Sequence, residues 1–194
     1  MKSGVRALGV AESYTGDRST MAGAVLRADR VVDGFGFGTC TVGGTDATDT
    51  VATLVERLDR PDVRYVLVAG IAPAWFNVLD LHAIAESVDR PVLSVSFEES
   101  SGLADDIRAA FEGDDRRRRL ATYTAQPDRR ALDLGGETVF VRSVGIADDE
   151  ADAVVREFTP EGGRPEPLRV ARLAARAADG ARRAWIGSEE VSED

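Results

Sequence analysis

The sequence is poor in the residues that most often ligate metals or act as nucleophiles. Cys40 is its one cysteine and His82 its one histidine. A single cysteine excludes an intrachain disulfide and fits a reducing cytoplasm. A zinc site made of cysteine and histidine lacks enough ligands. We expect Cys40 to be a small packed side chain at the end of a strand, and His82 to be a partly exposed residue on a helix.

Long apolar runs are also missing. No segment approaches the ~20 apolar residues of a membrane-spanning helix, and the N-terminal residues MKSGVRALGVAES lack the apolar centre of a signal peptide. The glycines of Gly34–Gly38 have the wrong spacing for a phosphate-binding loop. With 43% hydrophobic and 30% charged residues, the 194-residue chain is expected to form one cytoplasmic domain, 1–194, with an acidic, frayed tail at 188–194. No membrane partner is expected.

Lysine is nearly absent. Lys2 is the only one, so 24 − 1 leaves 23 arginines, and the net charge is −10. Acidic, lysine-poor sequences resemble those of salt-loving archaea, in which acidic surfaces hold water and ions. A GC-rich genome that favours arginine codons produces the same bias. The net charge argues against nucleic-acid binding, although a local basic face remains compatible with it.

The first half of the chain has the pattern of an α/β protein. Five strands are predicted, at Val5–Val10, Ser19–Arg27, Arg30–Cys40, Tyr65–Ala69 and Pro91–Val95. One predicted helix, which opens at Thr45–Asp49, lies between the third and fourth strands, and another, from about Val78, lies between the fourth and fifth. A short polar join predicts an antiparallel hairpin for the second and third strands. Three antiparallel strands followed by two crossover units are the connectivity of the RNase H-like fold. Right-handed crossovers then predict a mixed sheet of order 3-2-1-4-5 with helices on both faces.

The second half is less regular. We predict helices at Gly102–Phe111, Asp148–Phe158 and Leu168–Ala184. Two later strands are expected at Leu120–Thr124 and Glu137–Val144, the first preceded by a charged turn at Asp114–Arg119 and followed by a polar loop at Gln126–Asp133.

Three carboxylates are candidate metal ligands, and two of them, Glu12 and Asp46, are also candidate catalytic residues. In the predicted order, the carboxyl ends of the first and fourth strands lie side by side, where sites in open α/β sheets occur. Glu12, Asp46 and Asp80 follow strands or open helices near this edge. Magnesium or manganese clamping a phosphate would need several such carboxylates. Each has a structural alternative: Asp46 or Thr45 as a helix cap, Glu12 in a surface loop, and Asp80 at the start of a helix.

Four stretches resemble an archaeal, uncharacterised family called domain of unknown function ninety-nine, which is similar to endonuclease V. They are Ala7–Glu12 (ALGVAE), Gly43–Thr48 (GGTDAT), Ala69–Asn77 (AGIAPAWFN) and Arg164–Ala171 (RPEPLRVA). The last resembles the Pro-Glu-Pro-x-x-Arg-x-Ala run of endonuclease V and is the most specific. The resemblance implies an RNase H-like fold. Endonuclease V cleaves a strand near deaminated adenine with carboxylate-bound magnesium.

The sequence departs from that pattern where the chemistry would be. An aspartate would follow the Gly-Val of the first strand and another would end the central strand, but these positions are Ala11 and Ala69. The residue after the Arg-x-Ala of the last helix would be His or Asp, and here it is Arg172. Removing such ligands leaves too few negative oxygens to hold the ion. No metal cofactor is therefore expected.

The leading hypothesis is a binding protein on an endonuclease V-like scaffold. The resemblance implies a nucleic acid or nucleotide as the ligand, and aromatic rings can stack on bases. The candidate ligand-binding residues are Tyr14, Trp75, Phe76, Asn77, Arg169 and Arg172. One alternative is a magnesium- or manganese-dependent endonuclease for deaminated nucleic acid that uses Glu12, Asp46 and Asp80. Another is a protein-interaction module with an apolar patch near Phe35 and Phe37.

Overall fold

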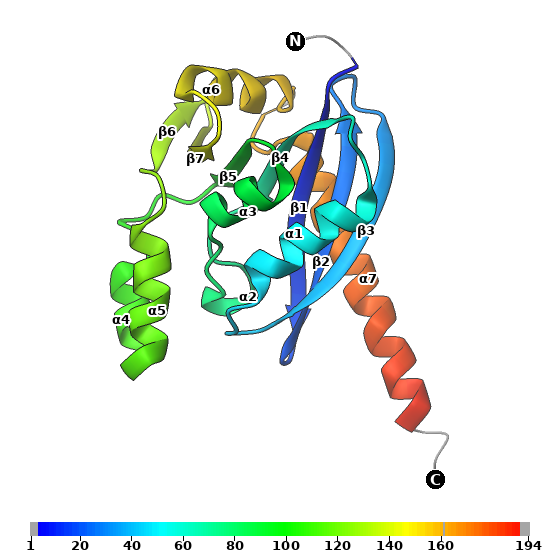
Figure 1. Ribbon diagram of the computed structural model, residues 1–194. Helices are drawn as coiled ribbons and strands as arrows, with labels where there is room; N and C mark the ends of the chain where they lie inside the picture. Colours follow the sequence, from blue (N-terminus) through cyan, green and yellow to red (C-terminus); the bar gives the residue numbers. More distant parts are fainter. Residues whose placement is uncertain (1–3, 161, 191–194) are drawn as a thin grey trace.

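The computed structural model describes residues 4–160 and 162–190. Its strands form a seven-stranded sheet in the order β3-β2-β1-β4-β5-β7-β6 (Figure 1). The strands are β1 Arg6–Thr15, β2 Arg18–Arg27, β3 Val32–Thr41, β4 Val63–Ala69, β5 Val92–Ser96, β6 Arg130–Asp133 and β7 Thr138–Val144. The helices are α1 Ala47–Leu58, α2 Pro73–Phe76, α3 Leu81–Val88, α4 Ala104–Ala110, α5 Gly113–Thr124, α6 Asp148–Glu157 and α7 Glu166–Glu190.

The predicted order 3-2-1-4-5 is confirmed. β1 pairs antiparallel with β2, and β2 with β3, whereas β4 is parallel to both β1 and β5. Two more strands extend the sheet, because β7 pairs antiparallel with β5 and β6 with β7. The carboxyl ends of β1, β4 and β5 therefore lie along one edge, which is where binding sites form in open α/β sheets.

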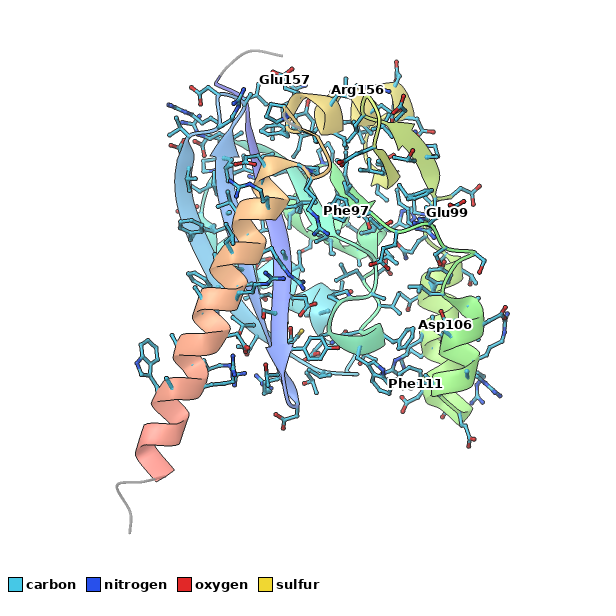
Figure 2. The ribbon with its side chains drawn as sticks, turned by 180° about the vertical axis from the view of Figure 1, so that it is seen from behind. Phe97, Glu99, Asp106, Phe111, Arg156 and Glu157 are labelled. Atoms are coloured by element: carbon cyan, nitrogen blue, oxygen red, sulfur yellow. The ribbon has the colours of Figure 1, made fainter. Side chains whose placement is uncertain are left out.

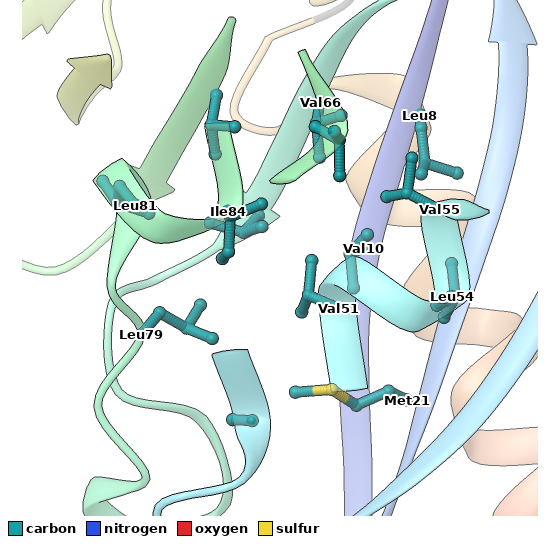
Figure 3. Packing of buried hydrophobic residues seen from close by; sticks show 14 of the residues in the cluster. Leu8, Val10, Met21, Val51, Leu54, Val55, Val66, Leu79, Leu81 and Ile84 are labelled. Atoms are coloured by element: carbon teal, nitrogen blue, oxygen red, sulfur yellow. The ribbon is translucent and has the colours of Figure 1, made fainter. Parts of the chain in front are cut away.

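Helices cover both faces of the sheet, as predicted. On one face, α1 and α3 contribute Val51 and Ile84 to an apolar cluster with side chains of β1 and β4 (Figure 3). On the other face, α6 and the start of α7 contribute Val154 and Leu168 to a second cluster over β4, β5 and β7. The core thus fixes the sheet edge from both sides.

Helix α7 approaches β1 closely at Gly9. A Cβ atom at this position would lie 2.2 Å from the carbonyl carbon of Pro167. Backbone atoms cannot yield by that much, so the contact requires glycine. The Pro-Glu-Pro turn at the start of α7 is thereby seated on β1, and the helix continues along β1 and β2 (Figure 1).

Three predictions for the second half were wrong. Asp114–Arg119 and Leu120–Thr124 belong to one helix, α5, instead of a turn followed by a strand. Aspartates in the first turn and arginines three or four residues later favour a helix through its dipole and through ion pairs, here Asp114–Arg117 and Asp115–Arg119. The predicted loop Gln126–Asp133 contains β6.

Several predicted ends also differ. β1 continues to Thr15 because Glu12, Ser13 and Tyr14 pair with residues of β2. α3 begins at Leu81, not at Val78, because Asp80 caps it. α7 continues to Glu190, and the remainder of the predicted tail lies outside the described residues. No helix in the described part of the chain is long and apolar enough to cross a membrane.

Candidate functional site

Two alanines are neighbours at the carboxyl edge of β1 and β4. The parallel register pairs Val10 with Val68, so the next residues, Ala11 and Ala69, follow side by side. Ala11 belongs to an apolar cluster with Ala171 of α7, and Ala69 packs against that cluster. Ala11 is 4% exposed. Methyl groups therefore occupy the two neighbouring strand positions at which the resemblance predicts carboxylates.

Glu12 lies within β1, so its alternative placement in a surface loop is wrong. Its carboxylate accepts a hydrogen bond of 3.0 Å from the hydroxyl of Ser19 on β2. Arg172 Nη1 lies 3.6 Å from Glu12 Oε1 and donates to the Glu12 carbonyl over 2.8 Å. Glu12 thus joins β1 to β2 and α7, and Arg172 offsets its charge.

Asp46 stands at the N-cap position of α1, but its side chain does not cap the helix. The carboxylate accepts hydrogen bonds from the backbone N–H and the hydroxyl of Thr41, each over 3.0 Å, and from Asn77 Nδ2 over 2.7 Å. Burial alone would raise the pKa of Asp46, but these hydrogen bonds prevail and hold the pKa below its usual value. Asp46 is an ionised acceptor that ties β3 to the loop before α3.

Asp80 is a helix cap. Its Oδ1 accepts hydrogen bonds from the backbone N–H groups of His82 and Ala83, over 3.0 and 3.2 Å. Gln126 Nε2 of the segment after α5 also donates to this oxygen, over 3.4 Å. His82 is exposed on α3. The structural alternative for Asp80 therefore accounts for its contacts.

The three candidate carboxylates do not fit a magnesium or manganese ion. Within residues 4–160 and 162–190, no three or more histidine, cysteine, aspartate and glutamate side chains are grouped so that they could hold a metal ion. Such ions take several oxygen ligands. The oxygens of Asp46 already accept protein hydrogen bonds, and Ala11 and Ala69 supply none.

Cys40 lies near Glu12 and Asp46, because the charges of both act on its thiol. It is fully buried, as predicted. Burial, and then the charge of Asp46, raise the pKa of the Cys40 thiol to about 11, against a lowering hydrogen bond with Ser19. The charge of Glu12 adds to the rise. Cys40 is thus a protonated, packed thiol at neutral pH.

Asn77 is buried and connects three segments. Its Oδ1 accepts a hydrogen bond from the backbone N–H of Ala47, at the start of α1, over 3.0 Å. Its Nδ2 donates to the carbonyl of Thr41 over 2.9 Å as well as to Asp46. Both amide hydrogens are therefore used inside the protein, so Asn77 acts on the site by positioning the loop that precedes it.

That loop, which includes the short element α2, has an unusual backbone. Ala74, Trp75 and Phe76 have φ values of 48°, 55° and 58°. Left-handed conformations of non-glycine residues cost of order 1–3 kcal/mol each, and they persist where surrounding contacts impose them. The Trp75 ring rests on Gly43 and contacts Phe111 at 5.2 Å between ring centres, yet Trp75 is 50% exposed. The loop holds a half-exposed indole in a fixed position.

Arg119 secures this loop, and no sequence motif singled it out. It is 4% exposed and donates to the carbonyls of Phe76 and Gly44 over 3.2 and 3.1 Å, and also to that of Gly43. Its guanidinium lies 3.9 Å from the ring centre of Phe111. Phe111 directly follows α4 and is labelled in Figure 2. Arg119 is the last of four successive arginines, 116–119, and no local pattern distinguishes it from the other three.

The remaining candidates are distributed unevenly. Tyr14 is 44% exposed near the tip of the β1–β2 hairpin. Arg172 faces Glu12, as described. Arg169 forms an ion pair with Glu166 and lines a separate hollow near Glu137. The structure thus groups Trp75, Phe76, Asn77 and Asp46, and pairs Glu12 with Arg172, but it turns Arg169 elsewhere.

Comparison with known proteins gives the family. The model of the family described as endonuclease dU matches residues 3–179. A UPF0215 protein of Methanopyrus kandleri is 33% identical over 181 residues, which cover 90% of this chain and 91% of that protein. A UPF0215 protein of Pyrobaculum calidifontis is 31% identical over 175 residues, covering 87% and 93%.

Solved structures agree on the fold. A protein from Archaeoglobus fulgidus superposes with a TM-score of 0.80 at 23% identity, covering 89% of this chain and 97% of that one. Endonuclease V from Streptomyces avermitilis gives 0.64 at 23% identity, covering 93% and 84%. Endonuclease V from Ciona intestinalis, in complex with DNA containing an inosine, gives 0.61 at 12% identity, covering 89% and 85%. These likenesses show an RNase H-like fold of the endonuclease V type. By its match to the family model and its archaeal relatives, the chain belongs to the endonuclease dU family.

Proposed function

We propose that this protein binds single-stranded nucleic acid without cleaving it by a metal-dependent reaction. The observation that carries the proposal is Trp75, a half-exposed indole held by three left-handed residues. Strained backbone is retained where surrounding structure enforces it, and such sites are often functional. A rigid, exposed aromatic ring is what a stacked base requires, and one stacked base contributes about 1–3 kcal/mol.

The surroundings of Trp75 support an extended ligand. Phe76 and Phe111 lie within 6 Å of the indole, measured between ring centres. At the carboxyl edge of β1, Tyr14 is exposed and Arg172 is half-exposed, with 41% of its side chain accessible. In the proposed complex a base stacks on Trp75 and the strand runs past the end of β1, where Arg172 meets a phosphate.

The relatives support the same ligand class. The Ciona endonuclease V structure contains DNA with an inosine, and the name of the matched family refers to deoxyuridine. We extend to this chain the binding of a strand with a deaminated base, but not the cleavage. Ala11 and Ala69 give an ion no oxygen ligand, and Asp46 and Asp80 are engaged as structural acceptors.

We further propose that the protein works in a salt-rich archaeal cytoplasm. Its net charge of −10 and its single lysine fit that medium, and its relatives are archaeal. Molar salt weakens phosphate contacts, because the release of counterions then drives binding less. Stacking is affected less than ion pairing, so Trp75 would carry much of the affinity under these conditions.

Fluorescence anisotropy with labelled single strands containing deoxyinosine, deoxyuridine or neither tests the proposal in buffers of rising potassium chloride. We expect saturable binding that Trp75→Ala weakens by about tenfold, as loss of one stacked base predicts. Trp185→Ala is the matched control, since Trp185 is 72% exposed on α7, away from the loop. No binding, or equal losses in the two variants, would refute the proposed role of Trp75.

The nuclease alternative is tested on the same strands with magnesium or manganese. We expect intact strands. Cleavage that disappears in Glu12→Gln or Asp46→Asn would overturn the binding-only proposal in favour of a nuclease that uses these carboxylates. Loss in Asp46→Asn alone would need a folding control, because Asp46 has structural hydrogen bonds.

A protein-interaction module is the second candidate function. Phe35 and Phe37 are 47% and 50% exposed on the edge strand β3, and their rings stack with centres 6.5 Å apart. Edge strands with exposed apolar side chains favour association. Association in sedimentation experiments that Phe37→Ser abolishes, together with no strand binding, would favour this candidate over nucleic-acid binding.

A further inference from the structure

We propose that a second site, separate from Trp75, binds a phosphate monoester between Arg129 and Arg142. These two arginines line a pocket of about 290 Å³ at the carboxyl edge of the sheet. None of the candidate positions predicted from the sequence includes them. The inference stands on this pocket and does not depend on the stacking role of Trp75.

The first observation is charge without an ion-pair partner. In the described part of the chain, no carboxylate lies within 4 Å of the guanidinium of Arg129 or Arg142 to form a salt bridge. Burial and the neighbouring charge of Arg142 lower the pKa of Arg129, against opposing effects of Tyr123 and Glu99. In a chain with 34 acidic residues, two uncompensated cations at one pocket are unusual. Two guanidinium groups match the charge of a phosphate monoester, about −1.5 to −2.

The second observation is how rigidly the two groups are held. Arg129 stacks on Phe140, 3.7 Å from its ring centre, and donates to Ser96 Oγ over 3.3 Å and to the carbonyls of Glu98 and Ser100. Arg142 donates to Tyr123 Oη over 3.2 Å and to the carbonyl of Pro127. A guanidinium has five N–H donors, so each retains at least two for a ligand. Carbonyl oxygens orient these cations but do not neutralise them.

The third observation is a hydroxyl that lines the pocket. Ser94 is 3% exposed as a residue and contributes to the pocket wall. Across the described residues, its hydroxyl has no hydrogen-bond partner. The antiparallel register places Ser94 beside Arg142, and Ser96 beside Phe140. A free hydroxyl next to two forked donors is a donor set that a tetrahedral anion can satisfy.

The charge of the pocket lining changes from the β1 end to the β7 end. Glu12 lines its β1 end, where Ser19 and Arg172 engage it. β1 is three strands away from β7, on the order of 14 Å at the usual strand spacing. The exposed Glu98 is the other lining carboxylate, and Arg129 contacts its backbone carbonyl. A phosphate therefore fits at the β7 end, and the volume admits a ligand about the size of one nucleotide.

Calorimetric titrations in phosphate- and sulfate-free potassium chloride test the site. The probes are a short strand with a 5′-phosphate, the same strand with a 5′-hydroxyl, deoxyadenosine 5′-monophosphate, deoxyadenosine and succinate. We expect the phosphorylated member of at least one pair to bind about tenfold more tightly, as a charge-assisted, forked contact predicts. Preference for the phosphorylated strand identifies a strand end as the source, and preference limited to the mononucleotide identifies a free nucleotide.

Variants separate binding from folding. Arg142→Gln and Arg129→Gln should abolish the phosphate-dependent gain, Arg142→Lys should retain part of it, and Ser94→Ala should reduce it several-fold. The matched control is Arg164→Gln, because Arg164 also stacks on a phenylalanine, Phe97, which is labelled in Figure 2. Arg164 does not line this pocket but a different hollow. Thermal melting without ligand shows whether each variant is folded. If Arg129→Gln is unfolded, the test of the phosphate site rests on Arg142→Gln.

Two results would overturn the inference. Equal affinity for phosphorylated and unphosphorylated probes would remove the phosphate site, as would an unchanged gain in a folded Arg142→Gln protein. Succinate binding as tightly as the phosphate probes would overturn the assignment to phosphate. If the 5′-hydroxyl strand binds but phosphate adds nothing, the proposed function stands and this inference fails. If deoxyadenosine 5′-monophosphate binds but no strand does, this inference stands and the proposed function fails.

Discussion

Asn77 donates a hydrogen bond of 2.7 Å from Nδ2 to Oδ1 of Asp46. The bond connects the loop after β4 to the residue that precedes α1, although 31 residues separate the two along the chain. Asn77 also accepts from Ala47 and donates to Thr41, so a single buried amide holds β3, α1 and this loop together. The position of the Trp75 indole follows from that arrangement.

Replacing Asn77 by alanine should therefore be costly. The substitution leaves the Ala47 N–H without a partner and removes the Asn77 hydrogen bond of the Asp46 carboxylate, which keeps its bonds to Thr41. An unsatisfied buried group costs about 1–3 kcal/mol, and a lost hydrogen bond to a charged group costs a similar amount. We expect the free energy of unfolding to fall by roughly 2–4 kcal/mol in urea titrations. Asn77→Asp keeps the shape but places a second carboxylate against Asp46, so its loss should be at least as large at neutral pH. A loss below about 1 kcal/mol would contradict the assigned role.

Asp46 should make the protein sensitive to acid. Because the folded pKa of Asp46 is held below its usual value, the carboxylate contributes stability above the unfolded pKa, about 3.9, and this contribution disappears as the pH falls through the lower folded pKa. The difference in unfolding free energy between the wild type and Asp46→Asn should be constant above about pH 5 and shrink below pH 4. Urea titrations across this range measure it. A difference that does not depend on pH would contradict the hydrogen-bonded, ionised Asp46.

Arg119 should be the arginine of α5 on which the aromatic loop depends. Arg119→Gln removes donors to the carbonyls of Phe76 and Gly44 and the contact with Phe111, so we expect a loss of about 2 kcal/mol and a red shift of Trp75 emission. Arg117→Gln is the control, because Arg117 is exposed and, among the residues that the structure describes, forms an ion pair only with exposed Asp114, a contact worth under ~1 kcal/mol. Trp185→Phe removes the other tryptophan signal. Equal effects of the two substitutions would refute the special role of Arg119.

The sequence predicted the fold best where local pattern and tertiary structure agree. The strands β1 to β5 have continuous or alternating apolar runs, and their order follows from the handedness of crossovers. β6 is four residues long with one buried side chain, Leu132, so it has no detectable periodicity. Leu120–Thr124 has strand-forming residues, but it continues a helix whose charged first turns are stable enough to extend through it.

The site was predictable only in part, for a related reason. Ala11 and Ala69 are at strand ends, so their juxtaposition follows from the topology. The roles of Asn77 and Arg119 depend on backbone N–H and carbonyl partners 30 to 76 residues away, which no local pattern encodes. Arg129 and Arg142 are likewise brought together only when β6 and β7 fold back beside β5.

Restoring carboxylates at Ala11 and Ala69 tests what the two methyl groups replace. Both positions adjoin the apolar cluster with Ala171, so two unpaired carboxylates there should lower Tm markedly, since an uncompensated buried charge costs several kcal/mol. If the two positions face a common ion, together with Glu12, manganese should raise the Tm of Ala11→Asp/Ala69→Asp by several degrees through preferential binding to the folded state. Neither single variant nor the wild type should gain as much. Equal manganese effects on all four proteins would show that the side chains at 11 and 69 do not converge on one ion. The proposal that the alanines at these positions prevent metal-dependent cleavage would then fail.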